Sequence, residues 1–516
     1  MYFLLIPVLL APVAAWIITA IVTVITFLAG LLGVKLKKRG MHAVVEFILN
    51  PRFLFCLSVI SGILTVYLWV FRFQRGTGQL IASTFQKKIN AEEAVILNNA
   101  NVFGKPPAFN DLSFVWKSCR DNFFRTPTVH ELVWLSGDRG VVYGVDRYDG
   151  KIKFEFSIQS FREGARVLPI YAELLVDVSG IYVGEGEHHH NSAVFRKFAF
   201  KEKKGLSLAW EFSTKGHIEG SPVIIGENII FGAGGDGIYS LNKHTGQKRW
   251  FLAEKEIGHL DNKIQTVAEN ILLATGMTTG FQKRFPQAKA YFAGISAASG
   301  TVNFKIPISS SWAGVTVIAS KSLAIVSVGM AAKYGHLTIP PDLVLTKGLL
   351  ITDLEGKVKN KISTDFAITN ENFSSGKHLY YYQEDITHVW DVFKYHLGQS
   401  AMPGAKANKS ALYRIPLTEL LQPGITGEKV FSHPQLLSGR GIVCRNVLLH
   451  VLKGGILIGF DLQQKKKIFA YDISESELDW LFSSPVIRGD RLYIANSAFK
   501  ANWFGESLLC FKLVTR

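Results

Sequence analysis

A short motif that returns along the chain constrains the fold more than any other feature of the sequence. It is clearest at Asn242-Lys-His-Thr-Gly246-Gln-Lys-Arg-Trp250 and returns at Asp146-Arg-Tyr-Asp-Gly150-Lys-Ile-Lys-Phe154, each time after a strand-like run. Looser copies lie at residues 201–205, 296–300, 352–356 and 461–465, the last without its glycine. A polar residue opens each turn, glycine supplies a positive φ, and β-branched or aromatic residues flank it. This pattern predicts a series of β-hairpins.

A second marker precedes these hairpins. Residues 221–231 (Ser-Pro-Val-Ile-Ile-Gly-Glu-Asn-Ile-Ile-Phe) match residues 484–494 position by position, as two apolar strands joined by a tight turn. Thr126-Pro127 and Leu168-Pro169 open two further units in the same way. Each unit therefore holds about four short strands, and a spacing of roughly 40 to 56 residues fits radial four-stranded blades better than a solenoid.

Counting the units predicts the architecture. Eight units begin near residues 120, 165, 218, 260, 312, 366, 437 and 477. The chain ends in the third strand of the last unit, at residues 508–513, and residues 112–116 form a strand without a unit of its own. Pairing these two strands would close a ring and remove two exposed sheet edges. We therefore expect an all-β, eight-bladed propeller with four-stranded blades over residues 111–516.

The full pattern G-x-x-Y-x-L-[ND]-x-x-T-G-x-x-x-W, carried best by residues 237–250, resembles the pyrroloquinoline-quinone-type (PQQ-like) repeat of β-propellers. This family includes quinoprotein dehydrogenases and a non-enzymatic lipoprotein subunit of the outer-membrane barrel-assembly machine. The resemblance spans residues 111–516 and implies the fold better than the function. It implies structural roles for two tryptophans that pack between blades and for the turn glycines: Trp210, Trp250, Gly150, Gly205, Gly246 and Gly300.

The N-terminal part predicts a membrane anchor. Residues 1–34 carry no charged side chain, residues 53–71 form a second uncharged run, and a helix needs about 20 apolar residues to span a bilayer. The basic loop between them should stay in the cytoplasm. We expect a two-span anchor at 1–76, a linker at 77–110, and a propeller on the periplasmic side of a bacterial inner membrane. A cleaved signal peptide is the alternative, but the first run lacks a basic n-region.

Charge and cysteine content narrow the partners. The net charge is +16, and residues 1–76 supply seven basic side chains against one acidic side chain. The remainder is mildly basic and has no arginine-rich run, so we expect no nucleic acid; anionic envelope polymers or lipid headgroups are the more natural counter-surface. Four cysteines without a C-x-x-C pair argue against a structural zinc cluster.

Histidines and acids cluster in neighbouring units. His217-Ile-Glu219 and His259-Leu-Asp261 occupy equivalent places just before the first strands of two units, and the tract at 184–191 contributes His188 and His190. Such places should border the central channel of a propeller. We therefore expect these six side chains to converge on an axial metal or polar-ligand site, since imidazole suits Zn, Cu, Fe or Ni. The alternative is that they only solvate a wet channel mouth.

The sequence favours a binding role over catalysis. Cys119, Cys444 and Cys510 are scattered, and the residues that would hold the quinone cannot be matched, so PQQ is not expected. We predict a non-enzymatic binding or assembly scaffold with a protein partner in the cell envelope. A PQQ-dependent dehydrogenase and a metal or small-ligand sensor are the alternatives. The aromatic and charged insertion at 380–423 could dock a partner or the membrane surface, or pack on its own blade.

Overall fold

The described part of the chain lies in its second unit. The computed structural model describes residues 101–515, apart from short gaps and the longer stretches 159–169, 187–191, 277–289, 330–344, 384–410, 434–440 and 499–506. The chain divides into two units between Arg75 and Gly76. Both predicted membrane spans and most of the predicted linker therefore lie outside the described residues. Within the described part, no helix has the length and hydropathy of a membrane span.

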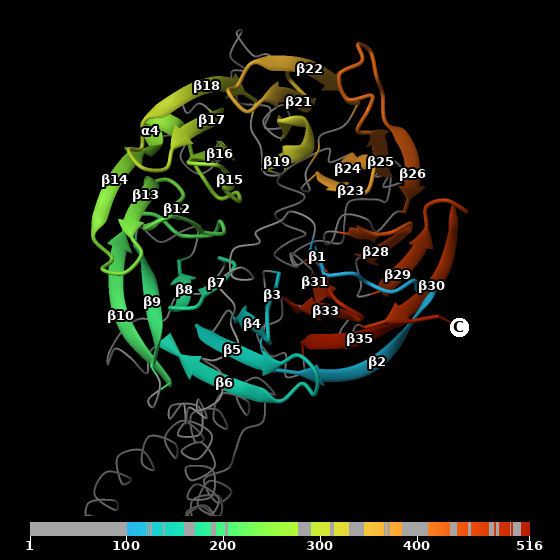
Figure 1. Ribbon diagram of the computed structural model, residues 1–516, viewed down its shortest axis with the longest axis horizontal. Helices are drawn as coiled ribbons and strands as arrows, with labels where there is room; N and C mark the ends of the chain where they lie inside the picture. The colour runs from blue at the N-terminus through green and yellow to red at the C-terminus, as the bar shows by residue number, and fades with distance from the viewer. Residues whose placement is uncertain are drawn as a thin grey trace, which may run out of the picture. The chain divides into compact units, whose positions relative to one another are not determined.

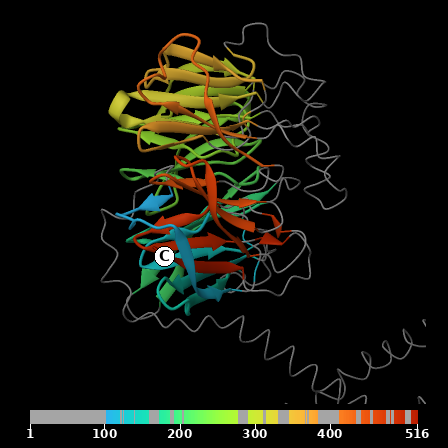
Figure 2. The same ribbon diagram turned by 90° about the vertical axis from the view of Figure 1, so that its right-hand side faces the viewer.

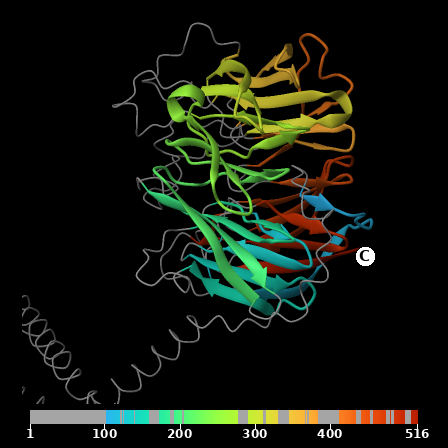
Figure 3. The ribbon, with the colours of Figure 1, turned by 60° about the vertical axis from the view of Figure 1, so that its left-hand side comes forward.

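In the described part of the chain, eight sheets of four or five strands follow one another around a ring, and the first strand of each lies nearest the centre (Figure 1). We call these sheets blades 1 to 8. Blade 1 contains β3 (Thr128–Val129), β4 (Leu132–Ser136), β5 (Val141–Asp146) and β6 (Ile152–Ser157). Blade 2 contains β7 (Leu175–Asp177), β8 (Gly180–Gly184), β9 (Ala193–Lys201) and β10 (Gly205–Thr214). Figure 3 brings the long β9–β10 hairpin toward the viewer.

Blades 3 to 5 repeat the same order. Blade 3 contains β11 (Val223–Ile225), β12 (Asn228–Gly232), β13 (Gly237–Asn242) and β14 (Lys248–Ala253). Blade 4 contains β15 (Gln265–Val267), β16 (Asn270–Ala274), β17 (Ala290–Ser296) and β18 (Val302–Ile308). Blade 5 contains β19 (Val315–Ile318), β20 (Leu323–Val328), β21 (Gly348–Asp353) and β22 (Val358–Ser363). The short helix α4 (Glu254–Ile257) links blades 3 and 4, and the 3₁₀ turn η3 (Ala319–Lys321) lies within blade 5.

Blades 6 and 7 complete the regular series. Blade 6 contains β23 (Phe373–Ser375), β24 (His378–Gln383), β25 (Ala411–Pro416) and β26 (Glu428–Ser432). Blade 7 contains β27 (Ile442–Cys444), β28 (Val447–Leu452), β29 (Ile456–Asp461) and β30 (Lys466–Asp472). Each first strand begins shortly after the predicted start of its unit. The predicted eight-bladed ring of four-stranded blades is therefore confirmed.

Blade 8 joins the two ends of the ring. Its strands β32 (Val486–Arg488), β33 (Arg491–Ala495) and β35 (Leu508–Val514) come from the C-terminus, and its outer strand β2 (Asp111–Ser118) comes from before blade 1. The predicted pairing of these two strands is confirmed, and it is antiparallel, with Leu112 opposite Leu513. Figures 1 and 2 show blue β2 beside red β35. Two short strands, β31 (Asp479–Trp480) and β34 (Ser497–Ala498), form a separate pair.

The predicted linker needs a correction at its end. Within 77–110, Val102 and Phe103 form β1 (Val102–Phe103), which pairs in parallel with Ile487 and Arg488 of β32. Two backbone hydrogen bonds accompany this pairing, from Ile487 N to Asn101 O and from Gly489 N to Phe103 O. Blade 8 therefore has a fifth strand at its inner edge, supplied by residues that were expected to belong to the linker.

Among the described residues, the hydrophobic core forms eight clusters, each between two neighbouring blades. Second strands such as β4 and β28 are buried along their whole length, whereas outer strands such as β6 alternate between buried and partly exposed residues. Strands buried on both faces read as continuous apolar runs. The core therefore ties each blade to the next around the ring.

Part of the predicted insertion at residues 380–423 is a regular strand of blade 6. Tyr380, Tyr381 and Tyr382 belong to β24, the second strand of blade 6, and are 4%, 1% and 1% exposed. They pack between blades and are unavailable to a partner, which corrects their assignment to an insertion. Residues 384–410 lie outside the described residues, so the predicted docking role of that segment is not tested.

Candidate functional site

The predicted His-x-acid triplets lie in two equivalent loops. His217 and Glu219 precede β11 of blade 3, and His259 and Asp261 precede β15 of blade 4. Each loop carries the chain from the outer strand of one blade to the inner strand of the next. The equal placement follows from the repeat, because His217 and His259 precede the first residues of β11 and β15 by the same number of residues.

Asp261 lies between the two imidazoles. Its Oδ1 is 2.9 Å from His217 Nε2, and its Oδ2 is 2.7 Å from His259 Nε2. The two imidazole ring centres are 5.4 Å apart. One ligand atom from each of the three residues lies within 4.8 Å of the others. The structure thus brings together two imidazoles and a carboxylate that the sequence placed in different blades.

Two further carboxylates flank this trio. Glu219 Oε2 is 3.7 Å from His217 Nε2, and Glu254 Oε1 is 3.7 Å from His259 Nδ1. His259 Nδ1 is buried and has no hydrogen-bond partner among the described residues. We call His217, Glu219, Glu254, His259 and Asp261 the His/acid cluster. Glu254 was not predicted, because it belongs to α4 and lies outside the His-x-acid spacing.

The backbone around the cluster holds the two histidines in place. A Cβ at Gly234 would lie 2.6 Å from His217 Cε1, and one at Gly186 would lie 2.8 Å from His217 Cα. His259 forms an isolated bridge with Gly276, whose N–H donates to the His259 carbonyl oxygen. Both histidines are nearly buried, with 5% and 3% exposure. The side chains therefore have little room to turn away from Asp261.

Burial and charge act against each other in the cluster. Burial alone would lower the pKa of His259, but the Asp261 carboxylate and then Glu254 raise it to about 10. Burial also opposes ionisation of Asp261, yet His259 and His217 hold the pKa of that carboxyl well below its usual range. Asp261 is therefore ionised and His259 protonated at neutral pH, so a metal ion that binds His259 would have to displace its proton.

The histidine tract lies mostly outside the described residues. His188 and His190 lie outside the described residues, so their predicted place in the site is not tested. Glu185, at the start of the tract, is 2% exposed and forms an ion pair of 2.6 Å with Arg196 of β9. This acid is therefore held by a buried arginine.

A cavity of about 430 Å³ lies where the inner strands of blades 1, 2, 4 and 8 face one another. We call it the axial cavity. Its lining includes Ser221 and Lys263, each four residues after a histidine of the His/acid cluster, and does not include the cluster itself. Ser221 and Lys263 thus line the cavity, where His217 and His259 were expected to do so.

The lining of the axial cavity carries four basic and two acidic side chains. One acid, Glu173, pairs with Lys263 at 2.9 Å and accepts a hydrogen bond from Ser221. The arginines bind mainly backbone carbonyls: Arg488 donates to Val129, Arg147 to His130 and Arg491 to Tyr148. Positive charge therefore exceeds negative charge along the lining.

Tyr148 lies between two of these arginines. Its ring centre is 4.7 Å from the guanidinium carbon of Arg147 and 5.2 Å from that of Arg491. Tyr148 is 53% exposed, whereas Nε of each arginine is buried without a hydrogen-bond partner among the described residues. Sequence reasoning missed this group. A signal existed, because Arg488 stands where the matching repeat has the apolar Ile225.

The tryptophans lie between blades. Trp210 packs against Gly246 and Trp250 against Gly300, each glycine in the outer turn of the next blade with a φ of +71° or +75°. Trp116 of β2 packs against Gly150 in the same way. Gly205 differs, because it opens β10 opposite Lys201.

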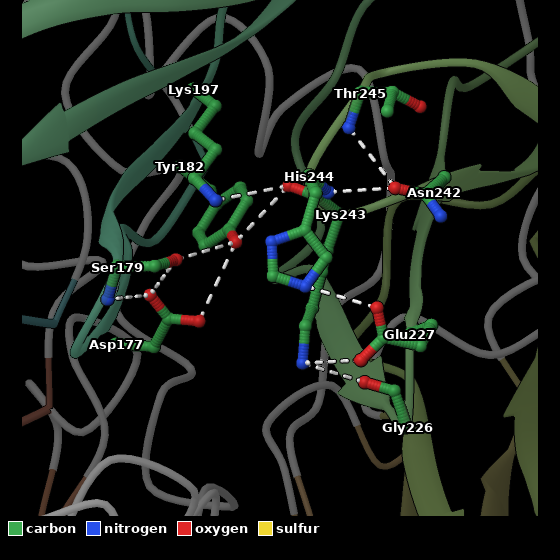
Figure 4. A network of polar contacts seen from close by, with 10 residues as sticks. All are labelled: Asp177, Ser179, Tyr182, Lys197, Gly226, Glu227, Asn242, Lys243, His244 and Thr245. Atoms are coloured by element: carbon green, nitrogen blue, oxygen red, sulfur yellow. Dashed lines mark hydrogen bonds and ion pairs between the residues drawn. The ribbon is translucent and has the colours of Figure 1, made fainter.

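A polar network surrounds one of these contacts, between blades 2 and 3 (Figure 4). The Lys243 carbonyl oxygen accepts a hydrogen bond from Lys197 Nζ at 3.1 Å, as Figure 4 shows. It also accepts one from Trp210 Nε1 at 3.2 Å. The Tyr182 hydroxyl lies 3.4 Å from both this oxygen and Asp177 Oδ2. Burial lowers the pKa of Lys197. This network fixes one blade to the next and reaches neither the His/acid cluster nor the axial cavity.

The chain is similar to several solved structures at low sequence identity. No protein-family model matches the chain. No curated protein matches it either. Similar solved structures include BamB from Moraxella catarrhalis, with 11% identity, a TM-score of 0.49, and coverage of 78% of this chain and 98% of that chain. A quinohemoprotein alcohol dehydrogenase from Pseudomonas putida has 12% identity and a TM-score of 0.49, with coverage of 80% of this chain and 78% of that chain. The C-terminal WD40 domain of Sif2 has 11% identity and a TM-score of 0.50, with coverage of 80% of this chain and 99% of that chain. At these identities the likeness concerns the fold alone.

Proposed function

We propose that this chain is a membrane-anchored propeller on the extracytoplasmic side of a bacterial inner membrane, where it binds a protein partner as a non-enzymatic scaffold. The anchor and its orientation rest on the two uncharged runs and the basic loop between them. The binding role rests on the axial cavity, whose volume of about 430 Å³ is that of a recognition pocket.

The lining of the cavity indicates what the partner offers. Three arginines and exposed Tyr148 gather at the junction of blades 1 and 8, and a guanidinium donates paired hydrogen bonds to carboxylates. Aromatic and arginine side chains are also the residues that contribute most to protein interfaces. The partner should therefore insert a short segment that carries an acidic group, because the cavity has room for a few side chains and none for a domain.

The experiment places a photo-crosslinking amino acid at Tyr148 of the full-length chain in its native membrane. The matched control places it at Leu421, which is similarly exposed, at 51%, in blade 6. We expect a discrete protein adduct from position 148, lost when Arg491 is replaced by glutamine, and none from position 421. Equal crosslinking at both positions would contradict a specific cavity.

A second measurement separates the scaffold from the oxidoreductase alternative. The purified chain is mixed with calcium and pyrroloquinoline quinone, and quinone absorbance and dye reduction are followed. We expect neither signal. Dye reduction that depends on both additions would replace the scaffold by a quinoprotein dehydrogenase.

A further inference from the structure

We propose that His217, His259 and Asp261, with Glu219 as the fourth donor, bind one divalent transition-metal ion between blades 3 and 4. The set offers two imidazole nitrogens and two carboxylate oxygens. This mixture suits zinc and its first-row neighbours better than calcium or magnesium, which prefer oxygen ligands alone. The site is separate from the axial cavity and goes beyond the proposed scaffold role.

The distances between donors support a shared ion. Zinc bonds of about 2.0 to 2.2 Å in a tetrahedral site place neighbouring donors about 3.3 Å apart. His217 Nε2 lies 2.9 Å from Asp261 Oδ1 and 3.7 Å from Glu219 Oε2. His259 Nε2 lies 2.7 Å from Asp261 Oδ2. These values bracket the expected separation. One donor atom from each residue of the central trio also lies within 4.8 Å of the other two.

The surroundings are those of a prepared site. Metal-bound histidines usually pass their second ring N–H to a carboxylate. His259 Nδ1 is buried, has no hydrogen-bond partner in the part of the chain that the structure describes, and lies 3.7 Å from Glu254 Oε1, so a small movement would supply that contact. Asp261, Glu219 and Glu254 also bring three carboxylates around two imidazoles, an excess of negative charge that a divalent cation would offset.

The ion would connect two blades. His217 and Glu219 come from the loop that enters blade 3, and His259 and Asp261 from the loop that enters blade 4. All four positions of a tetrahedral ion would be filled by protein, which is the arrangement of structural zinc sites. The side chains of Asp261 and Glu219 are each 19% exposed and provide a route for the ion to enter.

The test uses the full-length chain, purified in detergent, treated with a chelator and titrated with zinc chloride by calorimetry. We expect one zinc per chain with a dissociation constant below about 1 μM, since structural zinc sites bind strongly at neutral pH. Cobalt(II) should bind in its place and give the intense visible absorption of a four-coordinate ion. Zinc should also raise the midpoint of thermal unfolding, because it binds only the folded state.

The variants are Asp261→Asn and His259→Gln, with His244→Gln as the matched control. His244 is an exposed histidine whose Nε2 lies 3.0 Å from Glu227, so it forms a histidine–acid pair outside the cluster. We expect the two cluster variants to bind zinc at least about 100-fold more weakly, and the control to bind unchanged. Should either buried variant fail to fold, Glu219→Gln tests the same site and should weaken binding by at least about 10-fold.

Two results would overturn the proposal. One is a folded wild-type chain that takes up neither zinc nor cobalt. The other is an affinity that Asp261→Asn and Glu219→Gln leave unchanged. Either would show that the five residues form a buried hydrogen-bonded cluster without a metal. Neither would affect the crosslinking at Tyr148, so failure of the metal site and failure of the scaffold role are distinguishable.

Discussion

Trp250 of blade 3 packs against Gly300 of blade 4, and its indole N–H donates to the Ala297 carbonyl oxygen 2.9 Å away. A Cβ at Gly300 would lie 2.8 Å from the indole, and the φ of +75° there disfavours any other residue. Glycine is therefore required at position 300 for two reasons: the backbone has a positive φ, and the indole leaves no room for a side chain.

Replacing Gly300 by alanine should destabilise the protein by about 2 to 4 kcal/mol, the sum of a left-handed backbone penalty and the clash with Trp250. Gly226→Ala is the matched control, because its φ is +57° and nothing lies within 4 Å of its Cβ position. It should cost only about 1 to 2 kcal/mol. Chemical unfolding measures both, and equal losses would show that the indole contact contributes nothing.

Deleting residues 505–516 should abolish folding to a monomer. The deletion removes β35 and leaves β2 and β33 with unpaired edges, which recruit other strands. We expect aggregation or rapid proteolysis, detected by light scattering and limited digestion. Deleting only Thr515 and Arg516 keeps β35 and serves as the control. A monomeric, normally melting protein without β35 would contradict closure by this strand.

Single-cysteine variants should show that native thiols react slowly. Burial raises the pKa of Cys444 to about 11 and that of Cys510 to about 12. A raised pKa keeps the thiol protonated, so roughly one thiol in a thousand or fewer is a reactive thiolate at pH 8. Alkylation should accelerate with pH beyond pH 9 and be fast at pH 8 only in denaturant. Rapid native labelling of Cys510 would indicate that the closing strand opens.

Replacing Arg196 by methionine should cost about 3 to 5 kcal/mol, because it removes the 2.6 Å ion pair with the buried Glu185 carboxylate. The two side chains are 3% and 2% exposed, so water cannot take the place of the arginine. The double variant with Glu185→Leu should recover much of the loss. Unfolding of the single and double variants measures the coupling, and additive losses would argue against a buried ion pair.

Membrane orientation is tested by reporter fusions. Alkaline phosphatase fused after Arg516 should be active, whereas a fusion at Gly40 should be inactive, because the basic loop stays in the cytoplasm. Neutralising Lys35, Lys37, Lys38 and Arg39 should weaken this preference. The reverse activity pattern would place the propeller in the cytoplasm.

The fold was largely predictable because its signals are local. Turn glycines such as Gly246 and Gly300 show positive φ in the structure, and the repeat counts the blades. Two elements were missed for physical reasons. Val102 and Phe103 form a strand too short to show alternation. Tyr380 to Tyr382 read as an insertion because a second strand buried on both faces has no polar side to mark it.

The His/acid cluster was predictable for a similar reason. His217 and His259 stand at equivalent points of two repeats, and the ring brings equivalent points of neighbouring blades together. The axial cavity was not predictable from the sequence. Arg147 and Arg491 lie in the first and the last blade of the chain and come together only when the ring closes. Glu254 was also missed, because α4 is a connection that the repeat does not define.

The short strand β1 changes how the ring would respond to a mechanical load. Asp111 pairs with Val514 at one end of the β2–β35 seam, so forces drawing those two ends apart would break the seam one hydrogen bond at a time. A pull from the N-terminal side, however, reaches Val102 and Phe103 first, and these residues are held to β32. Tension transmitted along the chain is therefore borne by β1 before it can peel the closing seam.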